Sequence, residues 1–206
     1  MHLRTLSLAT LVTAVSLAAF GCGSSPEPVY YAMAPTHGTP QAGWAHLVEL
    51  RHPALAGYLD RAEIVSRVQD YRLHVASGES WSEPLGAMVG RLLSVDLAER
   101  LPGSVVYTEE SPISAAPEAI VSVDVQRFDV GDTGEVVLLA QLTVEKPPSH
   151  TAIASRRLEL HARPTASGTP GLVGAMSSLL GQLADEIATY LRGGGANASP
   201  ASGVNP

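Results

Sequence analysis

The sequence of 206 residues contains a single cysteine, Cys22, and this scarcity excludes two kinds of stabilising chemistry. One cysteine cannot form an intramolecular disulfide bond, and it cannot supply a zinc site built from several thiolates. We therefore expect neither a disulfide framework nor a metal. The fold has to rest on a hydrophobic core, and a chain of this length can bury one within a single domain.

Positive charge is also scarce. The chain has 13 Lys and Arg against 20 Asp and Glu, a formal net charge of −7, and Lys146 is its only lysine. A nucleic-acid-binding domain needs a basic stripe or patch, so nucleic acid is not an expected partner. No run of like charge is long enough to indicate an acidic or basic interaction tail.

Sequence motifs of common enzymes are missing as well. The chain has no G-x-S-x-G, P-loop or H-E-x-x-H motif, and no G-x-G-x-x-G followed by a helix. None of its seven histidines is paired with another at i, i+4 on a predicted helix. Asp60, Glu63 and Glu83 are conceivable acid–base groups, but nearby arginines explain them more simply as ion-pair partners. We expect no enzyme and no cofactor, with a periplasmic hydrolase as the alternative.

Cys22 stands at an informative position. A short basic start precedes an apolar, charge-free run from Leu6 to Phe20, as in a secretory signal peptide, and the cysteine follows after one glycine. This arrangement resembles a bacterial lipoprotein signal, in which such a cysteine is acylated and becomes the first residue. It departs from that pattern at Ala19, where leucine is preferred, and at the bulky Phe20. The alternatives are an uncleaved membrane anchor and an ordinary secretory signal.

The lipoprotein signal implies a division of the chain. Residues 1–21 are the signal peptide, 22–28 the lipidated cysteine and a polar linker, 29–192 one folded domain, and 193–206 a disordered tail rich in small residues. Acyl chains such as palmitate on Cys22 would hold the protein on a membrane. Gly23, in place of an aspartate, resembles the sorting signal for the outer membrane, with the protein facing the periplasm.

The stretch from Tyr58 to Leu101 is predicted to organise the domain. Tyr71 to Val75 alternates as a half-buried strand, and a break follows at residues 77–80. An amphipathic helix then runs to Arg100, with Ser82 as its cap and Pro84 in its first turn. Trp81 is predicted to be a buried anchor at the turn, with Pro84 and Leu85 beside it.

The remaining elements predict the fold class. A second amphipathic helix is expected over residues 170–191, with Thr169 as its cap and Pro170 at its first position. Alternation and turn residues predict further strands, the last three forming a meander. The sequence therefore predicts an α+β fold with a mostly antiparallel or mixed sheet and two helices on one face. The predicted strands are residues 29–33, 44–50, 104–108, 119–130, 135–146 and 151–162.

The segment from residue 58 to 67 is a candidate interface, because arginines flank an apolar pair, a mixture common at interface centres. The alternative is that the apolar pair fills the core while the arginines bind local carboxylates. The candidate contacts are Tyr58, Arg61, Ile64, Val65 and Arg67.

Several short motifs occur in a fixed order: the lipoprotein cysteine, Tyr30-Tyr31, Tyr58-Leu59-Asp60-Arg61 with Ile64-Val65 and Arg67, and Trp81-x-Glu83-Pro84-Leu85 before a leucine-rich helix. Together they resemble the PqiC (YmbA-like) auxiliary lipoproteins of ABC-type transport systems. The resemblance covers roughly residues 22–192.

The resemblance implies a non-enzymatic protein that docks on a PqiB-like protein with mammalian-cell-entry (MCE) domains, in a system carrying phospholipid between membranes. It also implies a fold like the amino-terminal domain of TolB. The alternative is a lipoprotein that assembles or stabilises an outer-membrane complex without handling lipid. Because such a domain acts through a surface, we also expect a homo-oligomer.

Overall fold

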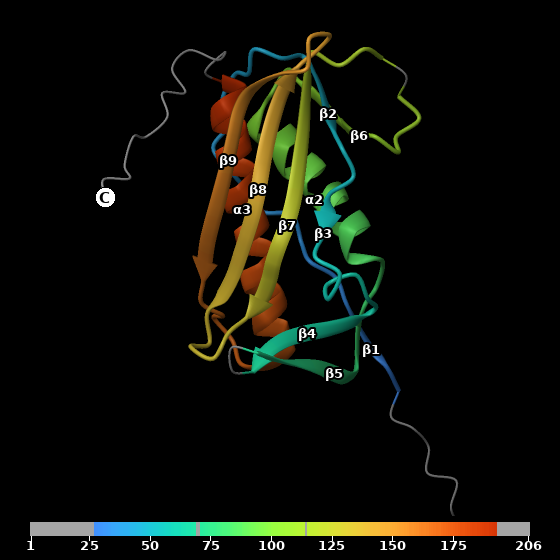
Figure 1. Ribbon diagram of the computed structural model, residues 1–206, viewed down its shortest axis with the longest axis vertical. Helices are drawn as coiled ribbons and strands as arrows, with labels where there is room; N and C mark the ends of the chain where they lie inside the picture. Colours follow the sequence, from blue (N-terminus) through green and yellow to red (C-terminus); the bar gives the residue numbers. More distant parts are fainter. Residues whose placement is uncertain (1–26, 69–70, 114, 193–206) are drawn as a thin grey trace, which may run out of the picture.

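The computed structural model describes residues 27–68, 71–113 and 115–192, which fold into two sheets and two helices (Figure 1). Cys22, the signal peptide and the tail from residue 193 lie outside the described residues. The larger sheet has the order β6 (Val105–Thr108), β2 (Leu47–Leu50), β7 (Ala119–Val130), β8 (Val136–Lys146) and β9 (Thr151–Ala162), with β3 (Ala54–Leu55) paired to β7. The smaller sheet has the order β1 (Val29–Tyr31), β5 (Arg72–Trp81) and β4 (Glu63–Val68). Parallel and antiparallel pairs both occur, which confirms the predicted α+β class. The likeness to TolB stays a prediction.

Three long strands form one side of the larger sheet: β7 (Ala119–Val130), β8 (Val136–Lys146) and β9 (Thr151–Ala162). They are antiparallel neighbours in chain order, which confirms the predicted meander. Gly134 has a φ of 75°, a conformation open to glycine, in the turn between β7 and β8. On β9, exposed and half-buried residues alternate from Arg157 to His161, so one face of this strand is solvated as predicted.

Shorter strands extend this sheet through parallel pairs. β2 (Leu47–Leu50) pairs with both β6 (Val105–Thr108) and β7, and β3 (Ala54–Leu55) pairs with β7. The predicted strand over residues 44–50 is therefore too long at its beginning. Two strands, β3 and β4 (Glu63–Val68), were not predicted, because the first has only two residues and the second lacks a clean alternation.

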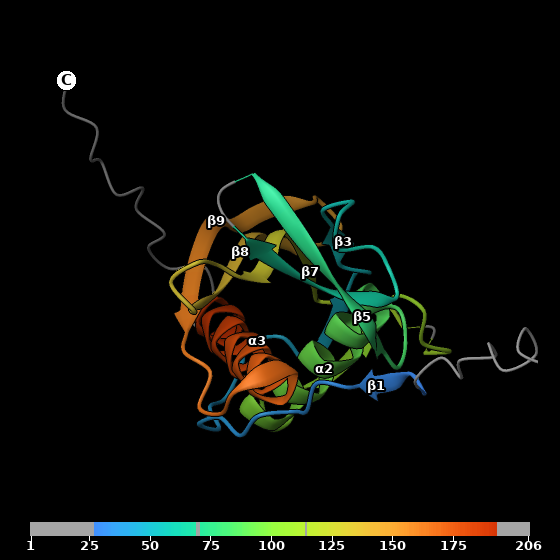
Figure 2. The ribbon, with the colours of Figure 1, turned by 90° about the horizontal axis from the view of Figure 1, so that it is seen from below.

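Both helices cover the same face of the larger sheet, as predicted (Figure 2). α3 (Gly168–Arg192) packs against β7, β8 and β9, and α2 (Leu85–Arg100) packs against α3 and β6. Leu93 and Leu97 of α2 and Leu183 of α3 are fully buried in one shared core. Burying each such leucine contributes about 1.5–3 kcal/mol, so packing fixes the position of these helices.

The predicted helix caps are wrong. The residue before α2 is Pro84, and no side chain caps the helix by a hydrogen bond. Ser82 instead follows directly after β5, and its backbone N–H donates to the carbonyl oxygen of Tyr31 at 2.9 Å. α3 begins at Gly168, so Thr169 lies inside the helix, and its hydroxyl donates to Glu79 at 2.6 Å. Both predicted capping residues make tertiary contacts that a local pattern cannot indicate.

The prediction for residues 71–80 is also wrong in two respects. β5 (Arg72–Trp81) continues through the expected break at residues 77–80, and Gly78 takes a φ of 77° within the strand. Tyr71, Leu73 and Val75, expected to be half-buried, are exposed instead, Tyr71 almost completely. Alternation alone does not show burial: β5 is the middle strand of the smaller sheet, but β1 pairs only with its last residues, Glu79–Trp81.

Candidate functional site

The predicted interface segment runs from the loop before β4 into β4, a strand of the smaller sheet that contacts β7. Ile64 and Val65 are buried, 3% and 6% exposed, so they fill the core and agree with the alternative interpretation of this segment. Arg61 lies 3.7 Å from Glu63, and both side chains are largely exposed. A role of Tyr58, Arg61 and Arg67 in binding a partner stays a prediction.

Tyr58 and Arg67 meet at a buried carboxylate that was not singled out from the sequence. The Tyr58 hydroxyl donates to Oδ2 of Asp129 at 2.6 Å, and Arg67 Nη2 donates to the same oxygen at 3.2 Å. Arg127 Nε donates to the other oxygen, Oδ1, at 2.8 Å. The Arg67 guanidinium also lies 5.6 Å from the centre of the Tyr58 ring. Asp129 is near the end of β7, so this cluster fastens β4 and the loop before it to the larger sheet.

The same cluster changes the acidity of Tyr58. Burial of the phenol, together with the hydrogen bond to Asp129 and the negative charge of that carboxylate, raises the pKa of Tyr58 from 10.0 to about 12. Arg67 counteracts part of this rise. Tyr58 is therefore a neutral hydrogen-bond donor at physiological pH, which suits a structural role.

Trp81 is buried as predicted, with 5% of its surface exposed. It ends β5, where it is aligned with Tyr31 of β1 (Val29–Tyr31), and its backbone N–H donates to the carbonyl oxygen of Ala62 at 2.7 Å. The side chain belongs to the same core as Leu85, the first residue of α2. Trp81 therefore joins the smaller sheet to the first turn of α2.

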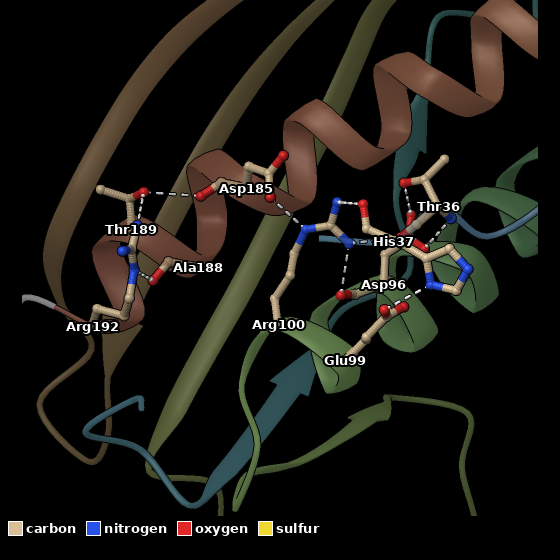
Figure 3. Close-up of polar contacts among 9 residues, drawn as sticks. All are labelled: Thr36, His37, Asp96, Glu99, Arg100, Asp185, Ala188, Thr189 and Arg192. Carbon is tan, nitrogen blue, oxygen red and sulfur yellow. Dashed lines mark hydrogen bonds and ion pairs between the residues drawn. The ribbon is translucent and has the colours of Figure 1, made fainter. Parts of the chain in front are cut away.

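A second buried polar cluster lies where both helices end (Figure 3). Arg100 is 2% exposed, and its Nε donates to Oδ1 of Asp185 at 2.6 Å. Its Nη1 donates to the carbonyl oxygens of Thr36 and Asp96 at 2.9 and 3.0 Å. One guanidinium thus holds α2, α3 and the segment after β1 together. The sequence pointed only to the position of Arg100 near a helix end, and not to these partners.

The segment around Thr36 is held from both helices. Its backbone N–H donates to Oδ1 of Asp96 at 2.8 Å, and burial raises the pKa of that carboxyl group. A side chain at Gly38 would collide with the Arg100 guanidinium, and one at Gly181 of α3 would collide with Thr36. These glycines therefore allow a close approach that the cluster requires.

A groove of about 480 Å³ runs along the outward face of the first half of α2, bordered by β6 and the loop after it. Gly86 and Gly90 let the chain at His52 and Pro53 lie close against the helix, since a Cβ on them would meet those residues at 3.1 and 3.2 Å. The groove combines charged and apolar groups. Its lining includes Arg51, Glu83, Ala87, Arg91, Glu110 and Ile113.

The charges at this groove are mostly paired. Arg91 forms an ion pair with Glu83, and His52 Nδ1 lies 2.8 Å from Oε1 of Glu110. Ile113 keeps 43% of its surface exposed beside them. A groove with paired charges around exposed apolar groups suits a protein partner better than a small charged ligand.

Residues 27–68, 71–113 and 115–192 contain neither a candidate metal site nor a candidate membrane-spanning helix. In these ranges no three His, Cys, Asp or Glu residues are placed to hold a metal ion. Within the same part of the chain, neither helix has the length and apolar character needed to cross a membrane.

The fold and these clusters define a class of protein: an α+β domain whose polar clusters hold its layers together and which has a groove along one of its helices. The sequence model of one family, the ABC-type transport auxiliary lipoprotein component, matches residues 31–188. The chain therefore belongs to the family of ABC-type transport auxiliary lipoprotein components.

Solved structures agree on the fold. The crystal structure of an uncharacterized protein is 20% identical, with a TM-score of 0.67, and the match covers 79% of this chain and 97% of that chain. Protein XCC0632 from Xanthomonas campestris, of the DUF330 family, is 17% identical with a TM-score of 0.67, covering 79% and 93%. No curated protein is similar enough in sequence to count as a match.

Proposed function

We propose that this protein is an outer-membrane-anchored periplasmic lipoprotein that assists an MCE- or Pqi-type ABC-linked system in moving phospholipid between membranes. The observation that carries the proposal is the family match over residues 31–188. The position of Cys22 after an apolar run supports the anchor. The protein acts by docking and catalyses no reaction.

In this proposal the partner is a PqiB-like periplasmic protein with MCE domains, and it docks in the groove along α2. Ala87 borders both this groove and a neighbouring hollow near Pro53. The exposed apolar surface of Ile113 and the paired charges around it support a protein contact here. Several copies of the lipoprotein associate around the partner.

A lipid-exchange assay tests the proposal. Cells lacking the protein should exchange labelled phospholipid between inner and outer membranes more slowly than cells that contain it, and the full-length chain should restore the rate. The matched control is a chain with Cys22→Ala, which should not restore the rate because it cannot be acylated.

The alternative function is a lipoprotein that stabilises an outer-membrane complex without handling lipid. It predicts unchanged lipid exchange together with loss of a complex from the outer membrane of the deleted strain. A periplasmic hydrolase, the remaining alternative, would be revealed by turnover of generic ester substrates by the purified protein.

A further inference from the structure

Exposed apolar side chains gather at one end of the molecule. Val29 and Tyr30 of β1 are 49% and 64% exposed. Tyr71, just before β5, is 98% exposed, and Leu73 and Val75 of β5 are 37% exposed each. Figure 1 shows β1, β4 and β5 together at the lower end, away from the turn between β8 and β9. One end of the domain thus carries most of the large apolar side chains that the described residues leave exposed.

The whole of β5 lies at this end of the molecule. It pairs with β4 through Arg72–Val75 and at Ser80, and with β1 only through Glu79–Trp81. Among the described residues, the first part of β5 therefore has no strand on its β1 side. Such an open edge exposes backbone N–H and C=O groups to whatever lies beyond it.

The composition of this edge is that of an interfacial segment. Residues 71–75 read Tyr-Arg-Leu-His-Val, so apolar and aromatic side chains alternate with basic ones, and no acidic residue lies among them. Tyrosine favours the boundary between a bilayer and water, and basic side chains are attracted to lipid phosphates. The next acidic residue along β5, Glu79, already accepts hydrogen bonds from Tyr31 and Thr169.

The short chain between Cys22 and β1 indicates that the surface facing the exposed edge of β5 is the lipid bilayer. Six residues lie between Cys22 and Val29, and the seven Cα-to-Cα steps that join the two residues reach about 25 Å even when fully extended. The anchor that belongs to the proposed function therefore keeps β1 close to the membrane. β1 pairs with the last residues of β5, Glu79–Trp81, and Figure 1 shows the whole of β5 at the same end of the molecule, so the edge at Tyr71–Val75 lies at that end too.

We propose that the β1–β5 end of the domain lies against the headgroup layer of the membrane that holds the lipid anchor. Tyr30, Tyr71, Leu73 and Val75 enter the boundary, and Arg72 and His74 face lipid phosphates. The open backbone edge stays in the headgroup layer, where water and phosphate oxygens can form hydrogen bonds with its unpaired N–H and C=O groups. The hydrocarbon core offers no such partners. This contact rests on the proposed anchor, and it orients the domain with the β8–β9 turn pointing away from the bilayer.

Fluorescence quenching by lipids tests this orientation. The mature, acylated protein is placed in phosphatidylethanolamine and phosphatidylglycerol vesicles whose acyl chains are either plain or brominated. Tyr71→Cys carries an environment-sensitive fluorophore, and the acylated Cys22 does not react with the dye. The control is Val105→Cys on β6, a residue that is also exposed, at 49%, but lies outside the smaller sheet. Flotation of both variants is measured in the same samples.

We expect the Tyr71→Cys probe to shift to the blue on vesicle binding and to lose fluorescence in brominated vesicles, while the Val105→Cys probe changes little. Floating protein with an unquenched, unshifted Tyr71→Cys probe would overturn the proposal and leave the anchor intact. A blue shift without quenching would overturn it too, because a second copy of the chain would then cover the edge. Protein that fails to float would refute the anchor and, with it, this contact.

Discussion

Asp129 shows how much of this fold depends on single polar residues. Its side chain is fully buried, and it accepts hydrogen bonds from Tyr58, Arg67 and Arg127. The two arginines are about three-quarters buried. The hydrogen-bonding capacity of this buried carboxylate is satisfied as long as all three donors stay in place. Removing its negative charge would leave the positive charges of the two guanidinium groups without a counter-charge.

Asp129→Asn should therefore lower the free energy of unfolding by about 3 kcal/mol. This value is near the lower end of the usual cost of breaking a buried ion pair, because water reaches both arginines. Urea denaturation measures the change. Asp124→Asn is the matched control, since Asp124 is an exposed residue of the same strand, and it should change stability little. Equal losses in the two variants would contradict the importance of the cluster.

Tyr58 should make stability fall at high pH. Its pKa is about 12 in the folded protein against an ordinary value of 10.0. The folded chain therefore holds the phenol proton when the unfolded chain has lost it, so the contribution is complete below pH 10 and is lost as pH rises from 10 to 12. Wild type should lose more stability than Tyr58→Phe across this window, measured by urea denaturation at each pH. Parallel curves would show that Tyr58 does not titrate differently on folding.

At the scale of elements, α3 offers two glycines with opposite expectations. A Cβ at Gly174 meets no atom within 4 Å, whereas one at Gly181 would collide with Thr36. Gly174→Ala should stabilise the protein by about 0.5–1 kcal/mol, because alanine favours the helix. Gly181→Ala should destabilise it by about 1–3 kcal/mol through overpacking. Melting temperatures that move in the same direction would contradict the tight packing of Thr36 on α3.

Trp81 tests the connection between the smaller sheet and α2. Because its side chain is buried in the core, Trp81→Ala should cost about 3–5 kcal/mol in the free energy of unfolding. Tyr30→Ala is the control on the same sheet, since Tyr30 is largely exposed. Thermal denaturation compares the two, and an unchanged melting temperature for Trp81→Ala would show that the indole is not part of the core.

The elements that could be predicted are those in which the sequence pattern of apolar and polar residues indicates which side chains are buried. β7, β8 and β9 were placed within about a residue, because each strand is long and its turns contain glycine, aspartate or proline. β5 was misjudged because alternation indicates two different faces but not whether a layer covers one of them. The polar clusters escaped prediction for another reason: Asp129 is 71 residues from Tyr58, and Arg100 is 85 from Asp185.

The candidate site divides in the same way. The burial of Trp81 and the ambiguity of the Tyr58–Arg67 segment could be argued from the sequence alone. The groove along α2 could not, because it depends on how closely His52 and Pro53 approach Gly86 and Gly90. Cys22, the residue with the clearest sequence signal, lies outside the described residues, so its acylation is a matter for mass spectrometry of the amino-terminal peptide.

At the scale of the whole molecule, α2 contains a matched pair of positions for testing the groove. Ala87 borders the groove, and Ala98 is an exposed residue of the same helix outside it. Arginine is a good helix former, so neither Ala87→Arg nor Ala98→Arg should change stability much. Only Ala87→Arg fills the groove, and it should weaken binding of the partner at least tenfold if the groove is the central contact.

Recruitment of the partner to vesicles tests the central claim most directly. The mature, acylated protein is placed in phospholipid vesicles, and the soluble MCE-domain protein of the same organism is added and measured by flotation. We predict saturable recruitment by the wild-type protein and by Ala98→Arg, and weak recruitment by Ala87→Arg. Vesicles that carry the folded, anchored wild-type protein yet recruit no more MCE-domain protein than bare vesicles would contradict the account.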